Sequence, residues 1–344
     1  MIPFKDAASL FHSTPAPVFT VDSHTEGEAT RLIVDGIAPL PGPTMMEKLT
    51  HFQTHYDDLR CRLTQEPRGS RDILAALVTE PVTTGAKFGL IYMDARRYPY
   101  LCGHATMGAV KTLADMGALE LKNGENQILV DTPSGPMTAL ARVEGGRVSS
   151  VALDMVPAFV AAEDCKIEVP GFGPVVVDLV CTGGYFAMVD ADRLGIPPTM
   201  ENRETLIDLG MKIIDAANEQ LKVAHPLTPG VTTVDVTEFH TTADGRARGS
   251  GMVVYGESHM DRSPCGTGTA AKLALLAHRN KLDLFQPYEN ASPLGTTFQA
   301  QLVEKTTMGP NEAWVTRIQG RAWVTGIHQF ILDPADPFPR GYLV

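Results

Sequence analysis

The chain has 344 residues, of which 44% are hydrophobic and 20% charged, and its formal net charge is −11. Its apolar content is sufficient for a sizeable core, and its length predicts two domains of average size. Such an acidic chain is a poor candidate for binding nucleic acid or an anionic membrane through bulk charge, although a local site can still bind a small anion.

The N-terminal stretch lacks the basic and apolar regions of a secretory signal, and no run approaches the roughly 18 apolar residues of a membrane span. We therefore expect a cytoplasmic protein with no membrane partner. The five cysteines are an odd number, lie far apart and form no CxxC pair; they are Cys61, Cys102, Cys165, Cys181 and Cys265. This distribution argues against a disulfide framework and against a structural zinc site.

Hydrophobic periodicity predicts alternating strands and helices in the first half of the chain. In chain order we expect an arm of low order at residues 1–17, strands at 18–21 and 30–34 flanking the polar turn SHTEGEA, a helix at 45–63, strands at 73–78 and 88–93, a helix that follows Cys102 and stops at Gly117, and strands at 128–130, 137–143 and 148–153.

The second half is predicted to repeat this order loosely. We expect strands at 175–180 and 185–189, a helix at about 203–222, further strands up to 253–255, a helix at 270–280 that follows Cys265, and strands from 296 to the end. Residues 270–280 are apolar on nearly every side, which is typical of a helix buried in the middle of its domain.

Cys102 and Cys265 are each followed by glycine and then by an apolar helix, and 265 minus 102 places them 163 residues apart, close to half the chain. This spacing is consistent with a duplicated unit that has one cysteine per copy. A lone Cys-Gly before an apolar helix is more often a small buried residue than a catalyst, so the pairing carries the functional interpretation.

A sulfur just before a helix lies near backbone N–H groups that lack partners and near the positive end of the helix dipole, and both favour the thiolate. The same N–H groups can bind a carboxylate. If two such helix starts face a small amino acid, one thiolate can remove the α-proton while the opposite thiol delivers a new one. This chemistry would invert the α-carbon without a cofactor.

Between about residues 19 and 335 the sequence resembles the proline racemase family. The matching stretches are DSHTEGEATR at 22–31, EPRG at 66–69, Met93-Asp94, Cys102-Gly-His104, Gly183-Gly184, NEQLKVAHP at 218–226 and DRSPCGTG at 261–268. The last of these is the most specific.

The resemblance implies an α/β (α+β) fold of two pseudo-symmetric domains, each a mixed β-sheet wrapped around a central helix, as in diaminopimelate epimerase. We expect the first domain at residues 1–158 plus 326–344 and the second at 159–325, with the active site between them. The resemblance also implies a homodimer that uses neither pyridoxal phosphate nor a metal, and a small-molecule substrate, proline or a hydroxyproline.

Residue roles follow from the same resemblance. Cys102 and Cys265 match the two acid/base cysteines, and the N–H groups of Gly103, His104, Gly266 and Thr267 match a cradle for the substrate carboxylate. Asp261 matches the carboxylate that binds the ring nitrogen, with the His104 side chain as its companion. Each has a simpler alternative, since Asp261 could be only a helix cap and His104 a core histidine.

Both cysteines are present, which disfavours dehydration of trans-3-hydroxyproline, because dehydratases of the family usually replace one of them. HTEGEATR resembles proline racemases more than the HTCGNPVR pattern of hydroxyproline epimerases. Tyr255 aligns with an aromatic residue that packs on the substrate ring, whereas Leu74 replaces a typical aromatic and could leave room for a ring hydroxyl. We therefore favour proline racemase, with 4-hydroxyproline 2-epimerase as the alternative.

Two further alternatives come from other functional classes. A non-catalytic imino-acid-binding protein would bind its ligand without exchanging the α-proton. A redox-responsive protein would join Cys102 and Cys265 in a disulfide. Intact cysteines at both positions argue against the first, and oxidation is better explained as inactivation than as function.

Overall fold

The computed structural model describes residues 17–242, 247–256, 258–333 and 335–344. The arm expected at residues 1–17 therefore lies outside the described residues, apart from Pro17. The described chain divides into two units. The first combines the residues up to Thr25 with Ala29–Ser149 and Ala322–Val344, and the second combines Glu26–Glu28 with Ser150–Arg321.

The first unit is built on one mixed sheet. Its strands are β1 (Val18–Thr25), β2 (Glu28–Asp35), β3 (Leu74–Thr79), β4 (Phe88–Met93), β5 (Gly124–Thr132), β6 (Gly135–Glu144) and β17 (Ala322–Phe330), and its helices are α1 (Met45–Thr64) and α2 (Gly103–Asp115). β17 pairs antiparallel with β1, which pairs with β2. From there the sheet continues with β3 parallel to β2, β4 antiparallel, β5 parallel and β6 antiparallel.

The second unit has a longer mixed sheet. Its strands are β8 (Phe159–Val169), β9 (Gly173–Cys181), β10 (Tyr185–Asp190), β11 (Val234–Thr241), β12 (Arg248–Tyr255), β13 (His259–Met260), β14 (Tyr288–Ala291), β15 (Thr297–Met308) and β16 (Asn311–Gly320), joined at its end by β7 (Arg147–Asp154). Its helices are α3 (Ala191–Leu194), α4 (Arg203–Gln220) and α5 (Gly266–His278), with the short 3-10 helix η2 (Met200–Asn202) before α4.

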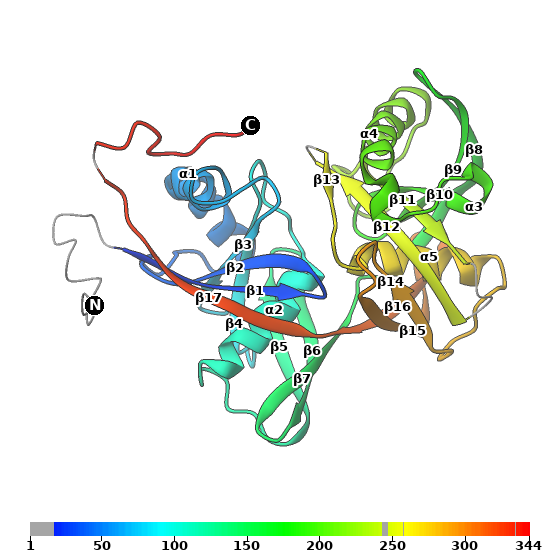
Figure 1. Cartoon of the computed structure of the whole chain (residues 1–344). Helices are drawn as coiled ribbons and strands as arrows, with labels where there is room; N and C mark the ends of the chain where they lie inside the picture. The colour runs from blue at the N-terminus through cyan, green and yellow to red at the C-terminus, as the bar shows by residue number, and fades with distance from the viewer. Residues whose placement is uncertain (1–16, 243–246, 257, 334) are drawn as a thin grey trace. The chain divides into compact units, whose positions relative to one another are not determined.

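The two sheets share one order of strand directions. β9 pairs antiparallel with both β8 and β10. β11 is parallel to β10, β12 antiparallel to β11, β14 parallel to β12 and β15 antiparallel to β14. This sequence of directions matches β17, β1, β2, β3, β4, β5 and β6 of the first unit. The crossover helices correspond as well (Figure 1). α1 and α4 precede the first strand that joins in parallel, β3 or β11, and α2 and α5 precede the second, β5 or β14. The expected pseudo-symmetric α/β fold is confirmed.

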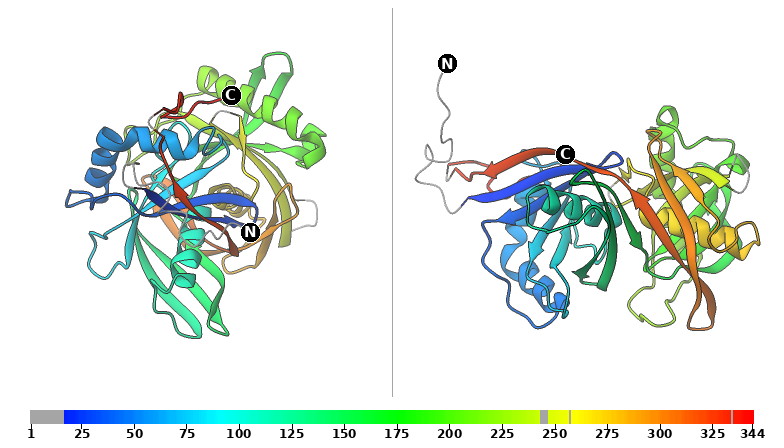
Figure 2. Two further views of the ribbon diagram at one scale, coloured as in Figure 1. Left: turned by 60° about the vertical axis from the view of Figure 1, so that its left-hand side comes forward. Right: turned by 90° about the horizontal axis from the view of Figure 1, so that it is seen from below.

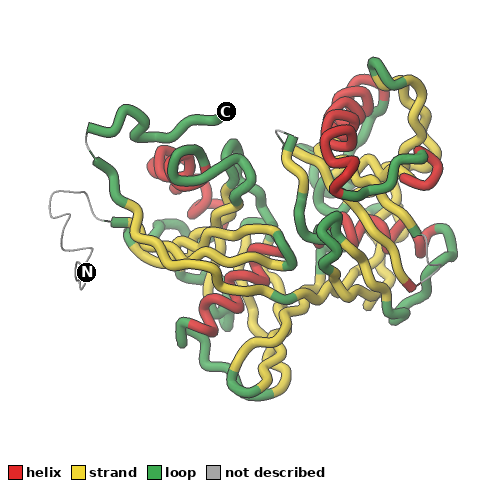
Figure 3. Tube along the Cα trace, in the orientation of Figure 1, coloured by secondary structure: helices red, strands yellow, loops and turns green. Residues whose placement is uncertain are grey.

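In each unit the second crossover helix occupies the centre. α2 contacts β1, β17, β3 and β6, and α5 contacts β8, β9, β10, β12, β15 and β16. The strands curve around these helices in all views (Figures 1 and 2), and Figure 3 shows each central helix in red among yellow strands. A curved sheet can surround a helix only if the helix is apolar all round, and α5 has buried residues on every face.

Several details predicted from sequence periodicity are wrong. The helix expected at 270–280 begins at Gly266, and β14 was not predicted. The turn predicted as SHTEGEA is shorter, because Ser23–Thr25 continue β1 and only Glu26 and Gly27 form the turn. Strand β8 was not predicted, because more than half of its residues are at least partly exposed and its alternation is irregular. The strands expected to reach the C-terminus stop at Phe330. Among the described helices, none is long and apolar enough to cross a membrane.

The core of the second unit contains a neutral histidine. His240 on β11 is buried, and neither ring nitrogen has a hydrogen-bond partner among the described residues. Burial, together with the positive charges of Lys272, Arg279 and Lys281, lowers the pKa of His240 from 6.5 to about 3. The folded unit therefore resists protonation at a pH where the unfolded chain accepts a proton.

This histidine predicts a loss of stability in acid. Its contribution is fully present above pH 6.5 and declines as the pH falls towards 3. Between pH 8 and pH 5 we expect the free energy of unfolding to fall by about 2 kcal/mol through this residue alone. Denaturant unfolding of wild type and His240→Met measures the effect, with the exposed His55→Met as control. Equal pH dependence in wild type and His240→Met would contradict it.

Candidate active site

Cys102 is the residue at which the central helix of the first unit begins. It is the N-cap of α2 in extended conformation, with φ −147° and ψ 112°, and its side chain makes no capping hydrogen bond. Its carbonyl oxygen accepts hydrogen bonds from the Thr106 N–H at 3.0 Å and from Thr106 Oγ1 at 2.8 Å. The sulfur is thus left for other contacts, beside N–H groups of the first turn that have no intrahelical partner.

His104 contacts the Cys102 sulfur. Sγ lies 3.2 Å from Nδ1 and 3.7 Å from Nε2 of the imidazole, and both side chains are buried. Thr25 Oγ1 donates to the His104 carbonyl oxygen at 2.8 Å. Tyr92 forms a 2.7 Å hydrogen bond to Thr106 Oγ1 from the neighbouring strand β4. The first turn of α2 is therefore fixed to two strands of its own sheet.

Cys265 begins the central helix of the second unit, but with a different backbone. Its φ is +56°, in the left-handed region, which costs a non-glycine residue roughly 1–2 kcal/mol. Its Sγ accepts a hydrogen bond from the Gly268 N–H at 3.4 Å and lies 3.5 Å from Thr267 Oγ1. The sulfur therefore turns back over the first turn of α5 and takes the N-cap position itself.

Asp261 organises the turn that leads to Cys265. Its Oδ1 accepts hydrogen bonds from Ser263 N–H at 2.8 Å and Ser263 Oγ at 2.7 Å, and Ser263 Oγ accepts from the Cys265 N–H at 3.1 Å. The N-cap of α5 is Cys265, so the alternative in which Asp261 caps this helix is wrong. Ser263 was missed as a site residue, although it lies inside the DRSPC motif.

The acidity of Cys265 differs from the sequence expectation. Burial raises the pKa of the Cys265 thiol well above 9.0, and the negative charges of Asp261 and Glu238 raise it further. Hydrogen bonds from Thr267 and the Gly268 N–H lower the pKa, but by less. The prediction that a helix start favours the thiolate is therefore wrong for Cys265 within this unit, because desolvation of the sulfur outweighs the N–H donors.

The residues assigned to the ring-binding wall lie on strands. Leu74 is the first residue of β3, is buried and pairs with Thr30. Tyr255 ends β12, is half-buried and packs edge-on against the His259 ring, with centroids 4.7 Å apart. The structure therefore groups Cys102, Gly103 and His104 in the first unit, and Asp261, Cys265, Gly266 and Thr267 in the second.

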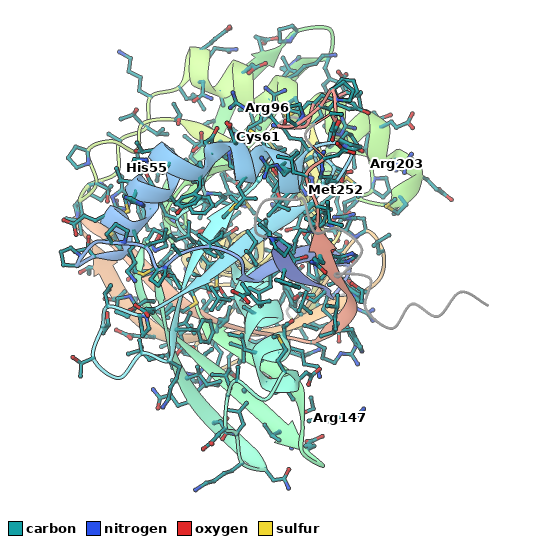
Figure 4. The ribbon with its side chains drawn as sticks, turned by 90° about the vertical axis from the view of Figure 1, so that its left-hand side faces the viewer. His55, Cys61, Arg96, Arg147, Arg203 and Met252 are labelled. Atoms are coloured by element: carbon teal, nitrogen blue, oxygen red, sulfur yellow. The ribbon has the colours of Figure 1, made fainter. Side chains whose placement is uncertain are left out.

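The other three cysteines lie away from the helix starts, and all five cysteines of the chain, each within the described residues, are free. Cys61 is on α1, where Figure 4 labels it, Cys165 on β8 and Cys181 on β9. Burial raises the pKa of all three thiols, for Cys181 to about 12. Within the described part of the chain no group of three or more His, Cys, Asp or Glu side chains is arranged to hold a metal ion.

A model of the proline racemase family matches residues 20–343. The chain belongs to the proline racemase family. A 4-hydroxyproline 2-epimerase from Streptosporangium roseum is 38% identical over 94% of this chain and 97% of its own, and a proline racemase from Clostridioides difficile is 35% identical with the same coverage.

The fold agrees with that of solved family members. A hydroxyproline epimerase from Agrobacterium vitis, solved with bound trans-4-hydroxy-L-proline, superimposes with a TM-score of 0.88 at 28% identity and covers 96% of this chain and 95% of its own. Both named relatives in the sequence comparison are isomerases that act on amino acids. The match to the proline racemase family extends across both cysteine-bearing helices.

The charge of Asp261 predicts a measurable change in Cys265 reactivity. Asp261→Asn removes a negative charge that disfavours the thiolate, so the pKa of Cys265 should fall and alkylation by iodoacetamide should begin at lower pH. Peptide-resolved mass spectrometry measures the modification of Cys265 as a function of pH. Asp235→Asn, in the same unit, is the matched control. An unchanged profile in Asp261→Asn would contradict the electrostatic contact.

Proposed function

We propose that the chain is a cofactor-independent racemase or epimerase that inverts the α-carbon of proline or a hydroxyproline with the thiols of Cys102 and Cys265. The observation that carries this proposal is their equivalent position. Each cysteine is the N-cap of the central helix, at the same point in the same order of strands in its unit. A duplicated unit that retains a cysteine at both positions supports a reaction that uses two equivalent groups.

The proposed chemistry is proton transfer on opposite faces of the α-carbon. One thiolate accepts the α-proton, and the electron pair of the broken C–H bond moves onto the α-carbon and its carboxylate. The other thiol then donates its proton to the opposite face and becomes the thiolate. Substrate inversion thus converts one thiolate–thiol pair into the reverse pair, and no electron or proton is left over.

The carboxylate is expected to bind at the helix starts. The N–H groups of Gly103, His104, Gly266 and Thr267 lie in the first turns of α2 and α5, where helices stabilise anions. As the α-proton leaves, negative charge grows on this carboxylate, and the same donors stabilise it. Asp261 supplies a negative charge for the ring NH2+ of the substrate, with the His104 side chain as a second partner.

The choice of ring is the finer part of the proposal. We favour proline because of the first-turn motif HTEGEATR. The alternative is 4-hydroxyproline, because Leu74 would give the substrate pocket a smaller wall and Tyr255 would supply a hydroxyl group that could bind a ring hydroxyl. The identities to the two named relatives, 38% and 35%, do not separate these substrates. Dehydration of trans-3-hydroxyproline is disfavoured by the presence of both cysteines. The proposal includes a homodimer and a cytoplasmic location.

The two-thiol reaction predicts the behaviour of cysteine variants. Cys102→Ser and Cys265→Ser should each lower the rate of inversion of L-proline, or of trans-4-hydroxy-L-proline, by at least about 100-fold, since a serine hydroxyl is a far weaker acid than a thiol. Polarimetry follows inversion, and NMR in deuterated water follows exchange of the α-proton. Cys181→Ser is the control, because Cys181 is buried on β9.

Two outcomes would contradict the proposal. If the wild-type protein exchanges the α-proton of neither substrate, the assignment to this reaction class fails, and tight binding without exchange would favour the imino-acid-binding protein. If either cysteine variant keeps full activity, the two-thiol mechanism fails even though the reaction class stands.

Tyr255 predicts how the ring is selected. Tyr255→Phe keeps the aromatic ring and removes a hydroxyl that could bind a ring hydroxyl of the substrate. We expect the ratio of kcat/KM for trans-4-hydroxy-L-proline to that for L-proline to fall about tenfold, the size of one hydrogen bond. Steady-state kinetics with both substrates measures the ratio. A ratio that does not change would remove Tyr255 from substrate selection.

A further inference from the structure

A buried ion pair joins the helix that begins at Cys265, α5, to the neighbouring strand β11. Lys272 on α5 and Glu238 on β11 both have side chains with 0% exposure, and Nζ lies 3.5 Å from Oε1. Removing two charges from water is costly, so a pair that is fully buried needs further polar contacts in order to be stable. Those contacts lead from Lys272 towards Cys265.

Lys272 is connected to the Cys265 turn through Asn290 on β14. Lys272 Nζ donates to Asn290 Oδ1 at 2.7 Å and to the Ser250 carbonyl oxygen at 2.7 Å. Asn290 Nδ2 in turn donates to the Pro264 carbonyl oxygen at 3.1 Å and to Thr269 Oγ1 at 2.8 Å. The lysine holds the amide oxygen, so the amide nitrogen must face the turn.

The Pro264 carbonyl belongs to the peptide that enters Cys265. Thr269 Oγ1 also donates to this oxygen, at 3.1 Å, and Ser263 Oγ accepts from the Cys265 N–H of the same peptide, so three side chains fix one peptide plane. Cys265 has a φ of +56°, and a non-glycine residue keeps this conformation only when its surroundings enforce it. Rotation of the Pro264–Cys265 peptide away from this conformation would break these hydrogen bonds and move the sulfur.

Glu238 fits this arrangement closely. A Cβ added to Gly268 would lie 2.5 Å from Glu238 Oε2, and one added to Gly251 would lie 2.7 Å from Oε1. The second glycine of the Cys-Gly-Thr-Gly sequence is therefore needed to admit the carboxylate next to the first turn of α5. Among the described residues neither oxygen of Glu238 has a hydrogen-bond partner, which leaves Lys272 as its counter-ion.

We propose that Asn290 and Lys272 are positioning residues that hold Cys265 in its left-handed conformation and so aim its sulfur, with Glu238 as the counter-ion that keeps Lys272 in place. This inference rests on the proposed acid/base role of Cys265. The charged and titratable groups around Glu238 are Lys272, Cys265, Asp261 and Tyr288. The positive charge of Lys272 partly offsets the effect of the negative charge of Glu238 on the Cys265 thiol.

The first test removes the hydrogen bond to Pro264. In Asn290→Ala we expect kcat for inversion to fall about 100-fold, the usual effect of a misplaced catalytic group, while KM changes by less than about threefold. Thr269→Val removes the second donor and should lower kcat in the same direction. Asn218→Ala is the matched control, because Asn218 in the same unit also donates through Nδ2 to a backbone carbonyl, that of Val234, at 2.8 Å.

A second measurement is independent of turnover. Peptide-resolved alkylation by iodoacetamide should modify Cys265 about tenfold faster in Asn290→Ala, because the released turn exposes a sulfur that is otherwise buried. The double variant Glu238→Gln, Lys272→Met removes both charges without leaving one unpaired, and it should show the same increase if Lys272 orients Asn290. Thermal unfolding identifies variants that fold, and Thr269→Val serves if Asn290→Ala does not.

The outcomes separate this inference from the proposed function. If Asn290→Ala and Thr269→Val both keep wild-type kcat and wild-type alkylation of Cys265, the positioning role is overturned, whatever Cys265→Ser does. If alkylation accelerates in Asn290→Ala although the wild-type protein inverts neither substrate, the positioning role stands and the proposed function fails. An equal loss of kcat in Asn218→Ala would also overturn the positioning role, because the loss of activity would then reflect general destabilisation of the unit.

Discussion

The site depends on one constraint, which is that each cysteine begins a helix buried along most of its length. This position supplies N–H donors that have no partner in the helix, and it also removes the sulfur from water. In the second unit desolvation dominates, and the pKa of Cys265 is raised. A thiol of high pKa gives a more basic thiolate, which is better matched to the very weakly acidic α-proton of an amino acid.

The two helix starts are held by different contacts although their sheets are alike. In the first unit Thr25 and Tyr92 fix the turn after Cys102, which has ordinary extended backbone. In the second unit Ser263 and Asn290 fix the turn around Cys265, which is strained. The two units thus share the position of the sulfur, while the polar side chains that support it differ.

Sequence patterns predicted the elements that follow a simple period. The helix that became α1 begins with a Thr44–Glu47 capping box, and α2 ends just before Gly117, which has a positive φ of 76°. β8 escaped prediction because it lacks a regular alternation of buried and exposed residues. Helical periodicity also did not predict that Lys272 is buried. A single charged residue in an apolar helix is expected to face solvent unless its partner, here Glu238, is known to lie opposite.

The raised pKa of Cys265 could not be predicted either, because it depends first on burial of the sulfur and then on the charges of Asp261 and Glu238, and Glu238 comes from a different segment of the chain. The local sequence predicts where the helix starts and therefore which backbone N–H groups lie near the sulfur. It does not predict that the fold removes water from around the sulfur. The resemblance to the proline racemase family predicted a role for both cysteines, and the structure shows the surroundings of each within its own unit.

The most direct test of the two-thiol mechanism is the position of the isotope at early conversion. The enzyme is equilibrated in deuterated water, L-proline is added, and both enantiomers are analysed by mass spectrometry before about a tenth has reacted. Two thiols on opposite faces predict D-proline that carries deuterium at the α-carbon and remaining L-proline that carries almost none. Deuterium appearing at equal rates in both enantiomers would indicate a single base and would contradict the mechanism.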